Sequence, residues 1–323
     1  ANYSLHSGLI LSGRPSMGAW ASYGLGSSNA DLPSYVVIHG GQVPSGGMQM
    51  TGEGFLPAAH GPSVLHPKGV VLQNISPLEK KEGLQRDKLA LLRQIDGQLQ
   101  ERRPDSALIA SAVKNYEMAY RMQMAVPEVT DVSKEPESIK KLYGLDSKFN
   151  NTRTYGAQCL MARRLVEQGV RFVELTITTG NGDRWDQHGG LKNGHTKNAL
   201  AVDQPIAALI KDLKSRGLLD STLLVFAGEF GRTPFAQGRD GRDHNPQGFS
   251  IWMAGGGIKG GTVYGATDEY GYHAVENKMT VHDMHANMLH LMGVNHEKLT
   301  YRYGGRDVRL TDVHGEIIPE ILA

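Results

Sequence analysis

The sequence contains 323 residues, and its 34 basic and 33 acidic side chains leave a net charge of +1 at neutral pH. This balance gives no electrostatic basis for binding nucleic acid or an anionic membrane surface. No apolar run approaches the roughly 20 residues that a membrane helix needs. A single cysteine, Cys159, excludes an intrachain disulfide. The length suits one large α/β domain over residues 1–323, with a substantial core.

Hydrophobic periodicity and the positions of Gly and Pro predict the secondary structure. The amino-terminal part is rich in Gly and Ser, long amphipathic segments dominate the middle of the chain, and short β-branched runs follow. In chain order we expect a helix at 15–26, a strand at 34–38, helices at 77–103, 106–124, 136–143 and 152–168, a strand at 171–177, a helix at 199–217, strands at 222–227 and 249–254, and a helix at 281–292.

Two neighbouring helices are expected to form a hairpin. Leucine and isoleucine recur at helical spacing between charged residues over 77–103, and Pro104 ends this segment. A second helix follows over 106–124, and residues 127–136 have the composition of an acidic linker. The short connection makes the two helices antiparallel neighbours. We therefore predict a helical hairpin, inserted into the domain at about residues 77–126.

Two apolar, β-branched runs predict parallel strands. Residues 171–177 and 222–227 are both bounded by glycine and are joined by a helix of about twenty residues. Strand, helix and strand in this order form a right-handed βαβ unit. Functional sites of open α/β sheets lie beyond the carboxyl ends of the strands. The polar residues that follow each run are therefore the first candidates for a site.

Carboxylate and imidazole side chains follow both runs. Asp186 and His188 come after the first run, and Glu229 comes directly after the second. Asp243 and His244 form another such pair farther along. Imidazole nitrogen and carboxylate oxygen are ligands of Zn²⁺. Convergence of these five residues from loops over one sheet would form a divalent metal site. Taken singly, each also fits a structural role, such as a capping Asp or an ion-paired Glu.

Two further residues are candidates for catalytic roles. Arg232 can bind an anionic substrate through its fork of donors, or can pair with Glu229 in a purely structural way. His195 can cap the site or line it. The histidines at 282, 285 and 290 fit an ordinary helix. The glycine-rich segment at 255–261 lacks the residues of a phosphate loop, and no nucleophile-elbow motif is present.

The chain resembles a known family, and the resemblance covers nearly all of it. It is carried by the segments WDQHGG, GLLDSTLLVFAGEFGRTP, GRDHNP, AGGGIKGGTVYGATDE and CLMARRLVEQGVRFVEL. These segments are similar to the DUF1501 family of bacterial proteins of unknown activity. The family in turn resembles the alkaline phosphatase-like and sulfatase-like superfamily. The resemblance implies a three-layer α/β/α sandwich with a mainly parallel sheet and a metal-dependent site over the carboxyl ends of its strands.

The resemblance also implies roles for individual residues. Asp186, His188 and His244 match the ligands of one metal ion in the superfamily. Glu229 and Phe230 stand where an Asp-His pair holds a second ion, and because Phe cannot ligate, the second site is weakened or absent. The family's first strand and a Gly/Ser-rich segment, which hold another carboxylate and any nucleophile, are expected upstream of residue 1. Family members often carry an export signal, which implies an extracytoplasmic location.

Two functions from different classes remain open. The first is a metal-dependent hydrolase of phosphate or sulfate esters, with Zn²⁺ expected first and Ca²⁺ or Mn²⁺ as alternatives, and a small anionic ester as substrate. The second is a non-catalytic structural or surface-binding member of the same fold, which the Phe230 departure favours. In a third interpretation the chain is one piece of a longer protein. The sequence does not specify the substrate, the metal or the oligomeric state.

Overall fold

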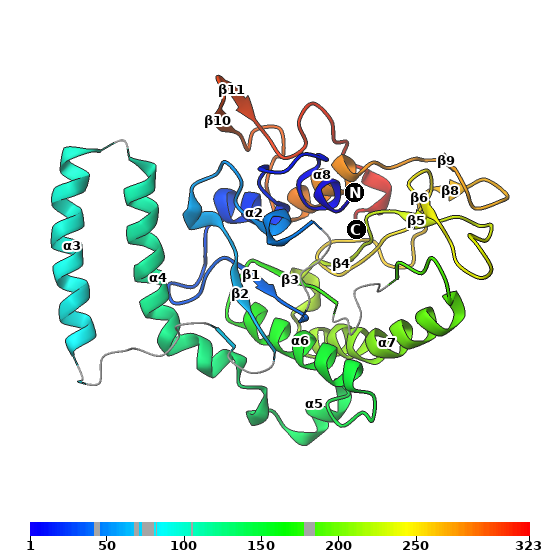
Figure 1. Cartoon of the computed structure of the whole chain (residues 1–323), viewed down its shortest axis with the longest axis horizontal. Helices are drawn as coiled ribbons and strands as arrows, with labels where there is room; N and C mark the ends of the chain where they lie inside the picture. Colours follow the sequence, from blue (N-terminus) through cyan, green and yellow to red (C-terminus); the bar gives the residue numbers. More distant parts are fainter. Residues whose placement is uncertain (42–45, 68–70, 73–80, 82, 105, 178–184) are drawn as a thin grey trace.

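The computed structural model describes residues 1–41, 46–67, 71–72, 81, 83–104, 106–177 and 185–323. These residues form a mixed α/β structure, which confirms the broad class expected from the sequence (Figure 1). The helices are α1 (Asn2–Ser7), α2 (Met17–Leu25), α3 (Leu84–Arg102), α4 (Ala107–Thr130), α5 (Glu137–Leu142), α6 (Asn150–Glu167), α7 (Leu191–Ser215) and α8 (Val281–Leu291). The strands are β1 (Tyr35–Ile38), β2 (Ser63–Leu65), β3 (Phe172–Leu175), β4 (Leu224–Phe226), β5 (Gly231–Arg232), β6 (His244–Asn245), β7 (Trp252–Ala254), β8 (Ala266–Thr267), β9 (Ala274–Glu276), β10 (Tyr301–Tyr303) and β11 (Arg306–Val308).

A three-stranded parallel sheet runs through the middle of the structure in the order β2-β1-β3. Val36 of β1 pairs with Ser63 on one edge and with Val173 on the other. All four residues of β1 are buried, and β1 has a neighbouring strand on each edge. Strands buried on both faces are expected to be continuous apolar runs, which is the pattern of this segment.

Helices cover both faces of this sheet (Figure 1). Ile38 packs with Leu165 of α6 in one core cluster, and α7 packs along α6. On the opposite face, the ring of Tyr35 lies against α2, which shares a second cluster with α8. A Cβ atom at Gly18 would lie 2.4 Å from that ring, so the close approach of α2 requires glycine there. The sheet is therefore enclosed between two helical layers.

The two strands of the predicted βαβ unit, β3 and β4, do not pair with each other among the described residues. Among the described residues, β4 pairs with β7 in an antiparallel two-stranded sheet, with Val225 opposite Met253. The strand β3 pairs with β1, so β3 and β4 belong to separate sheets although α7 connects them. The expectation of one sheet was wrong in this respect. Apolar composition indicates that a strand is buried, but it does not identify the strand's partner.

The helical hairpin is present, with α3 and α4 side by side at one end of the molecule (Figure 1). Gln85 donates to Gln123 at 2.6 Å, and Arg93 pairs with Glu117 at 2.7 Å. Residue numbers rise along one helix as they fall along the other, so the helices are antiparallel, as predicted. The predicted start of the first helix, at 77–80 and 82, lies outside the described residues.

The end of α4 differs from the prediction, because the helix continues through Pro127 to Thr130 where a linker was expected. An interior proline costs about 3 kcal/mol. Val126 and Val129 of this last turn are buried in the core cluster below the sheet. Burial of two valine side chains contributes about 3–6 kcal/mol. Tertiary packing therefore outweighs the local preference of proline.

None of the helices among the described residues combines the length and the apolar character that a membrane span requires.

Candidate metal centre

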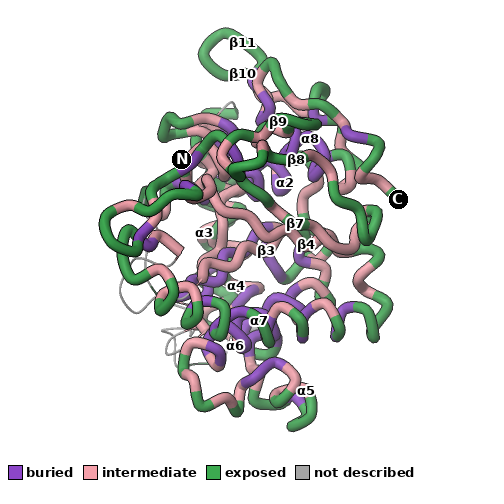
Figure 2. The backbone as a smooth tube through the Cα atoms, turned by 90° about the vertical axis from the view of Figure 1, so that its right-hand side faces the viewer, coloured by how far each residue is buried: buried purple, intermediate pink, exposed green. Residues whose placement is uncertain are grey.

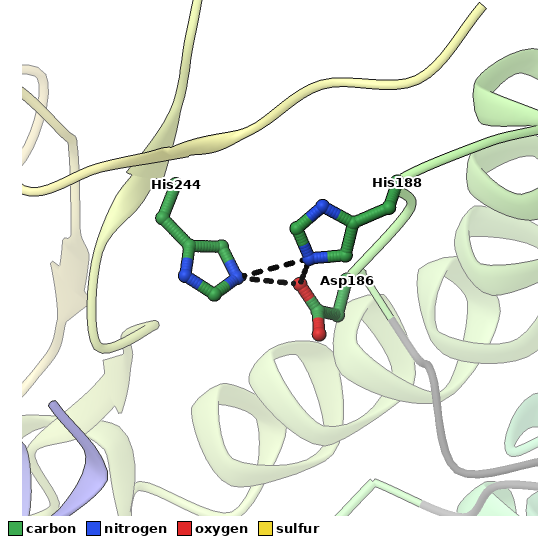
Figure 3. Close-up of side chains that lie close together, drawn as sticks. All are labelled: Asp186, His188 and His244. Carbon is green, nitrogen blue, oxygen red and sulfur yellow. Dashed lines mark hydrogen bonds and ion pairs between the residues drawn. The ribbon is translucent and has the colours of Figure 1, made fainter. Parts of the chain in front are cut away.

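Three predicted side chains converge at one point, Asp186, His188 and His244 (Figure 3). The Nε2 atoms of the two histidines lie 3.2 Å apart. Asp186 Oδ1 lies 3.2 Å from Nε2 of His188 and 3.0 Å from Nε2 of His244. The side chains are 39–43% exposed, so the point where they meet is open to solvent.

Two separate segments bring these residues together. Asp186 and His188 lie in the loop that leads into α7. His244 belongs to the short strand β6, which pairs with β5 so that His244 lies opposite Arg232. A Cβ atom at Gly231 would lie 2.6 Å from the carbonyl oxygen of Gly248, so β5 needs glycine at this position. The pairing of β5 and β6 therefore directs both Arg232 and His244 toward the loop before α7.

The spacing of the three donor atoms fits a divalent ion. Ligands at about 2.0–2.1 Å from a tetrahedral ion lie about 3.3 Å from one another. The donor atoms of Asp186, His188 and His244 are 3.0–3.2 Å apart, so a shift of a few tenths of an ångström would admit the ion. If all three side chains bound an ion, one position of a tetrahedral site would remain for another ligand, an arrangement typical of catalytic zinc sites.

A residue outside the predicted set orients His188. Gln237 Oε1 lies within hydrogen-bonding distance of His188 Nδ1. When Nδ1–H donates to this oxygen, Nε2 is left as the lone-pair atom that faces the other two ligands. Gln237 is itself held in place by two backbone hydrogen bonds with Gly241, of 2.9 and 3.0 Å. Its role could not be predicted from the sequence, because a glutamine in a polar loop is not part of any recognisable metal-binding motif.

Arg232 also contacts the carboxylate of this group. Its Nη2 donates to Asp186 Oδ1, the same oxygen that faces the two imidazoles. Burial tends to raise the pKa of Asp186, but the hydrogen bonds from Arg232 and His244 and the positive charge of Arg232 outweigh burial and lower it. Asp186 is therefore held in the ionised form in which a carboxylate binds a metal ion.

Aromatic rings border the site on two sides. The ring of Phe230 lies 4.1 Å from that of His244, and the guanidinium of Arg232 lies 5.4 Å from the Phe230 centroid. Trp185 adopts a left-handed backbone conformation, with φ of 62°, and contacts His195 edge to face at 5.3 Å. Burial lowers the pKa of His195, and the charge of Arg232 acts in the same direction. His195 is therefore adjacent to the site but outside the three-residue group.

The other two predicted ligands are not members of this three-residue group among the described residues. Asp243 is exposed, and its carboxylate accepts the backbone N–H of His244 at 2.8 Å. Glu229 is half-buried and lines a cavity that it shares with Asp186 and His6. A metal-binding role for Asp243 and Glu229, and a catalytic role for His195, stay predictions.

Comparison with known proteins gives one result that bears on the family. A family model with the description "Protein of unknown function (DUF1501)" matches residues 1–322. No curated protein and no solved structure matches the chain. This description specifies no activity, so the geometry of Asp186, His188, His244 and Arg232 is what bears on function.

Proposed function

The chain belongs to the DUF1501 family of proteins of unknown function, and we propose that it is a metal-dependent hydrolase of phosphate or sulfate esters. The observation that carries the proposal is the convergence of Asp186, His188 and His244, with donor atoms 3.0–3.2 Å apart. The helical layers on both faces of the sheet support assignment to a three-layer α/β/α sandwich of the alkaline phosphatase-like class. An extracytoplasmic location follows from the resemblance alone.

In this proposal Asp186, His188 and His244 hold one divalent ion. Two imidazole nitrogens and one carboxylate suit Zn²⁺ better than Ca²⁺, which prefers six to eight oxygen ligands, and Mn²⁺ remains an alternative. The ion supplies a Lewis acid that polarises an oxygen of the ester. His188 keeps its orientation through Gln237, and His244 is held by its contact with Phe230.

The charges of the site favour an anionic substrate. Asp186 carries one negative charge, which Arg232 balances through their ion pair. A bound divalent ion therefore leaves the site with a net positive charge. Phosphate and sulfate esters present several oxygens in a tetrahedral arrangement, which an arginine fork binds through charge-assisted hydrogen bonds. The open side of the site leaves room for a small ester of this kind.

Metal content and activity test the proposal together. The purified chain is expected to contain about one equivalent of zinc or manganese by elemental mass spectrometry, and to hydrolyse p-nitrophenyl phosphate or p-nitrophenyl sulfate. His188→Ala and His244→Ala should each lose both the metal and the activity. His290→Ala, on the exposed end of α8, is the matched control and should retain both. Activity that survives loss of the ion would exclude the metal-dependent reaction.

A non-catalytic role is the second candidate, and one observation favours it. Arg232 and His244 already satisfy Asp186 Oδ1, so the group is also stable as a structural ion-pair cluster. In that case the protein would be folded and free of metal, and no ester would be hydrolysed. The same measurement of metal content and activity therefore separates the two functions.

A further inference from the structure

A cavity of about 950 Å³ lies between β3 and β4. Its wall includes every residue of both strands, and it continues past both ends of each strand. Side chains of α6 and α7 line one side, and side chains of α8, including Met284 and Met288, line the other. The cavity is therefore a slot inside the layered part of the molecule, parallel to the two strands that border it.

The two strands lie in the same layer although they belong to different sheets. Leu175 of β3 and Leu224 of β4 pack against one core cluster, which contains residues of α6 and α7. Phe172 of β3 and Val225 of β4 pack against the other cluster, which contains residues of α2 and α8. Both strands thus have the same helical layers above and below. The slot occupies the position that a strand between them would take.

The exposed fractions of β3 and β4 are consistent with an unfilled strand position between them. The residues of β1, which has a strand on each edge, are at most 1% exposed. The residues of β3 and β4 are only partly buried, although both segments are predominantly apolar and each has a helical layer on both faces (Figure 2). Each of these strands is paired on one edge only among the described residues. Exposure therefore comes from the edge that faces the slot.

The backbone of β3 offers hydrogen-bonding groups to the slot. The N–H of Phe172 donates to the Ser34 carbonyl at 3.0 Å, and that of Thr176 donates to the Ile38 carbonyl at 3.3 Å. In a parallel ladder alternate residues face opposite edges. The N–H and C=O groups of Val173 and Leu175 therefore point away from β1, and no hydrogen bond joins them to any other described residue. Unpaired backbone groups at such an edge are a template for another strand.

We propose that this slot binds an extended, apolar peptide of about six residues as an additional β-strand. A strand of that length in a packed layer occupies about 4.8 Å by 10 Å by 20 Å, or roughly 1000 Å³. A cavity of about 950 Å³ has room for a strand of this size. A peptide that pairs with β3 on one edge and with β4 on the other joins the two sheets into one. It also supplies hydrogen-bond partners for the backbone groups of Val173 and Leu175. This inference does not depend on the proposed hydrolase activity, although one end of the slot reaches Asp186 and Glu229.

A synthetic peptide tests the proposal on the whole chain. The probe carries a fluorescent label and copies residues 33–40, which contain the fully buried strand β1. Binding is expected to slow hydrogen exchange at the amides of Val173 and Leu175, which exchange rapidly in the free protein. The amide of Thr176, already bonded to Ile38, should change much less. The same peptide with N-methyl groups at both valines cannot pair and should bind at least tenfold more weakly.

Variants of α7 give a second measurement. Ile210 lines the slot, so Ile210→Trp should fill part of it and weaken peptide binding at least tenfold. Leu200 lies on the same helix and is 55% exposed, so Leu200→Trp is the matched control and should bind the peptide as the parent chain does. If Ile210→Trp fails to fold, the comparison of the two peptides still decides the outcome.

Three results would overturn the proposal. The first is equal binding of the plain and the N-methylated peptide, because the slot would then be a site for apolar molecules in general. The second is slow exchange of Val173 and Leu175 in a free monomer, because the two sheets would then close on each other. The third is slow exchange of Val173 and Leu175 in a free protein that sedimentation shows to be a dimer. The occupant of the slot would then be a second copy of the chain.

Discussion

Arg232 and His244 lie opposite each other in the β5–β6 pair, and both contact the same oxygen of Asp186. One residue supplies a fixed positive charge to this oxygen, and the other supplies an imidazole nitrogen. The site therefore combines a candidate set of metal ligands with the guanidinium group of an arginine. This pairing suggests how the metal-binding and anion-binding functions of the proposed site can be separated by experiment.

Replacement of Arg232 should weaken anion binding without removing the metal. Arg232→Gln keeps a hydrogen-bond donor but loses the charge, and a hydrogen bond to a charged group contributes about 1.5–3 kcal/mol. The affinity of the metal-loaded protein for inorganic phosphate, measured by calorimetry, should fall roughly 10- to 100-fold. Arg302→Gln, at an arginine that is 69% exposed on β10, should have no effect. Unchanged phosphate affinity in the Arg232 variant would exclude this role.

Much of the site could be predicted because its candidate ligands are of distinctive residue types. Asp186, His188 and His244 follow apolar runs in loops, and the structure brings these three together. Glu229 satisfies the same criteria and lines the slot together with Asp186, but it is not a member of the three-residue group. Sequence position shows that a residue follows a strand. It does not show toward which neighbour the side chain turns.

The arrangement of the strands was harder to predict for a related reason. The run that contains β4 is as apolar as a central parallel strand, but β4 pairs with β7 in an antiparallel sheet. Helices on both faces of β4 explain its apolar residues. Cover on the faces of a strand does not determine which strand pairs with it at its edge. The continuation of α4 through Pro127 has the same origin, since packing of Val126 and Val129 outweighs a local signal.

Loss of the hydrogen bond that His188 donates to Gln237 should reduce metal affinity. Gln237→Leu removes the oxygen that accepts from His188 Nδ1 and frees the imidazole to rotate. Loss of such a supporting partner typically lowers metal affinity 10- to 100-fold. Competition with a chromogenic chelator measures the change for zinc. Gln237→Glu keeps an acceptor at the same place and should bind zinc at least as tightly as the parent chain. Equal affinity of all three proteins would contradict the orienting role.

Gly241 supports His188 through close backbone contact. A Cβ atom at position 241 would lie 2.0 Å from the carbonyl oxygen of His188, so the loop must move to accept any side chain. Gly241→Ala should therefore displace His188 and lower zinc affinity at least tenfold in the chelator assay. Gly260→Ala is the matched control, because a Cβ atom there meets no atom within 4 Å. A loss of zinc affinity in both variants would indicate a general effect of alanine.

His285 should make the chain less stable in mild acid. The side chain is buried on α8, and its Nε2 hydrogen-bonds to the Leu5 carbonyl at 2.8 Å. Burial lowers the pKa of His285 from 6.5 to about 4, and the neighbouring His282 and His6 act in the same direction. Between these two values the unfolded chain binds a proton that the folded chain does not. Stability therefore falls as the pH drops from 6.5 to 4, by about 3 kcal/mol when the full shift is expressed.

Urea unfolding between pH 7 and pH 4.5 measures this dependence. His285→Gln retains a donor for Leu5 but has no titrating group, so its stability should fall less steeply with acid than that of the parent chain. The ionisable groups that face His285 make their own contributions to the pH dependence of stability. Burial lowers the pKa of His282, whereas for His6 the pairing with Glu174 outweighs burial and raises the pKa. Those contributions remain in the variant, so the difference between the two curves isolates His285. Parallel curves would show that His285 titrates equally in both states.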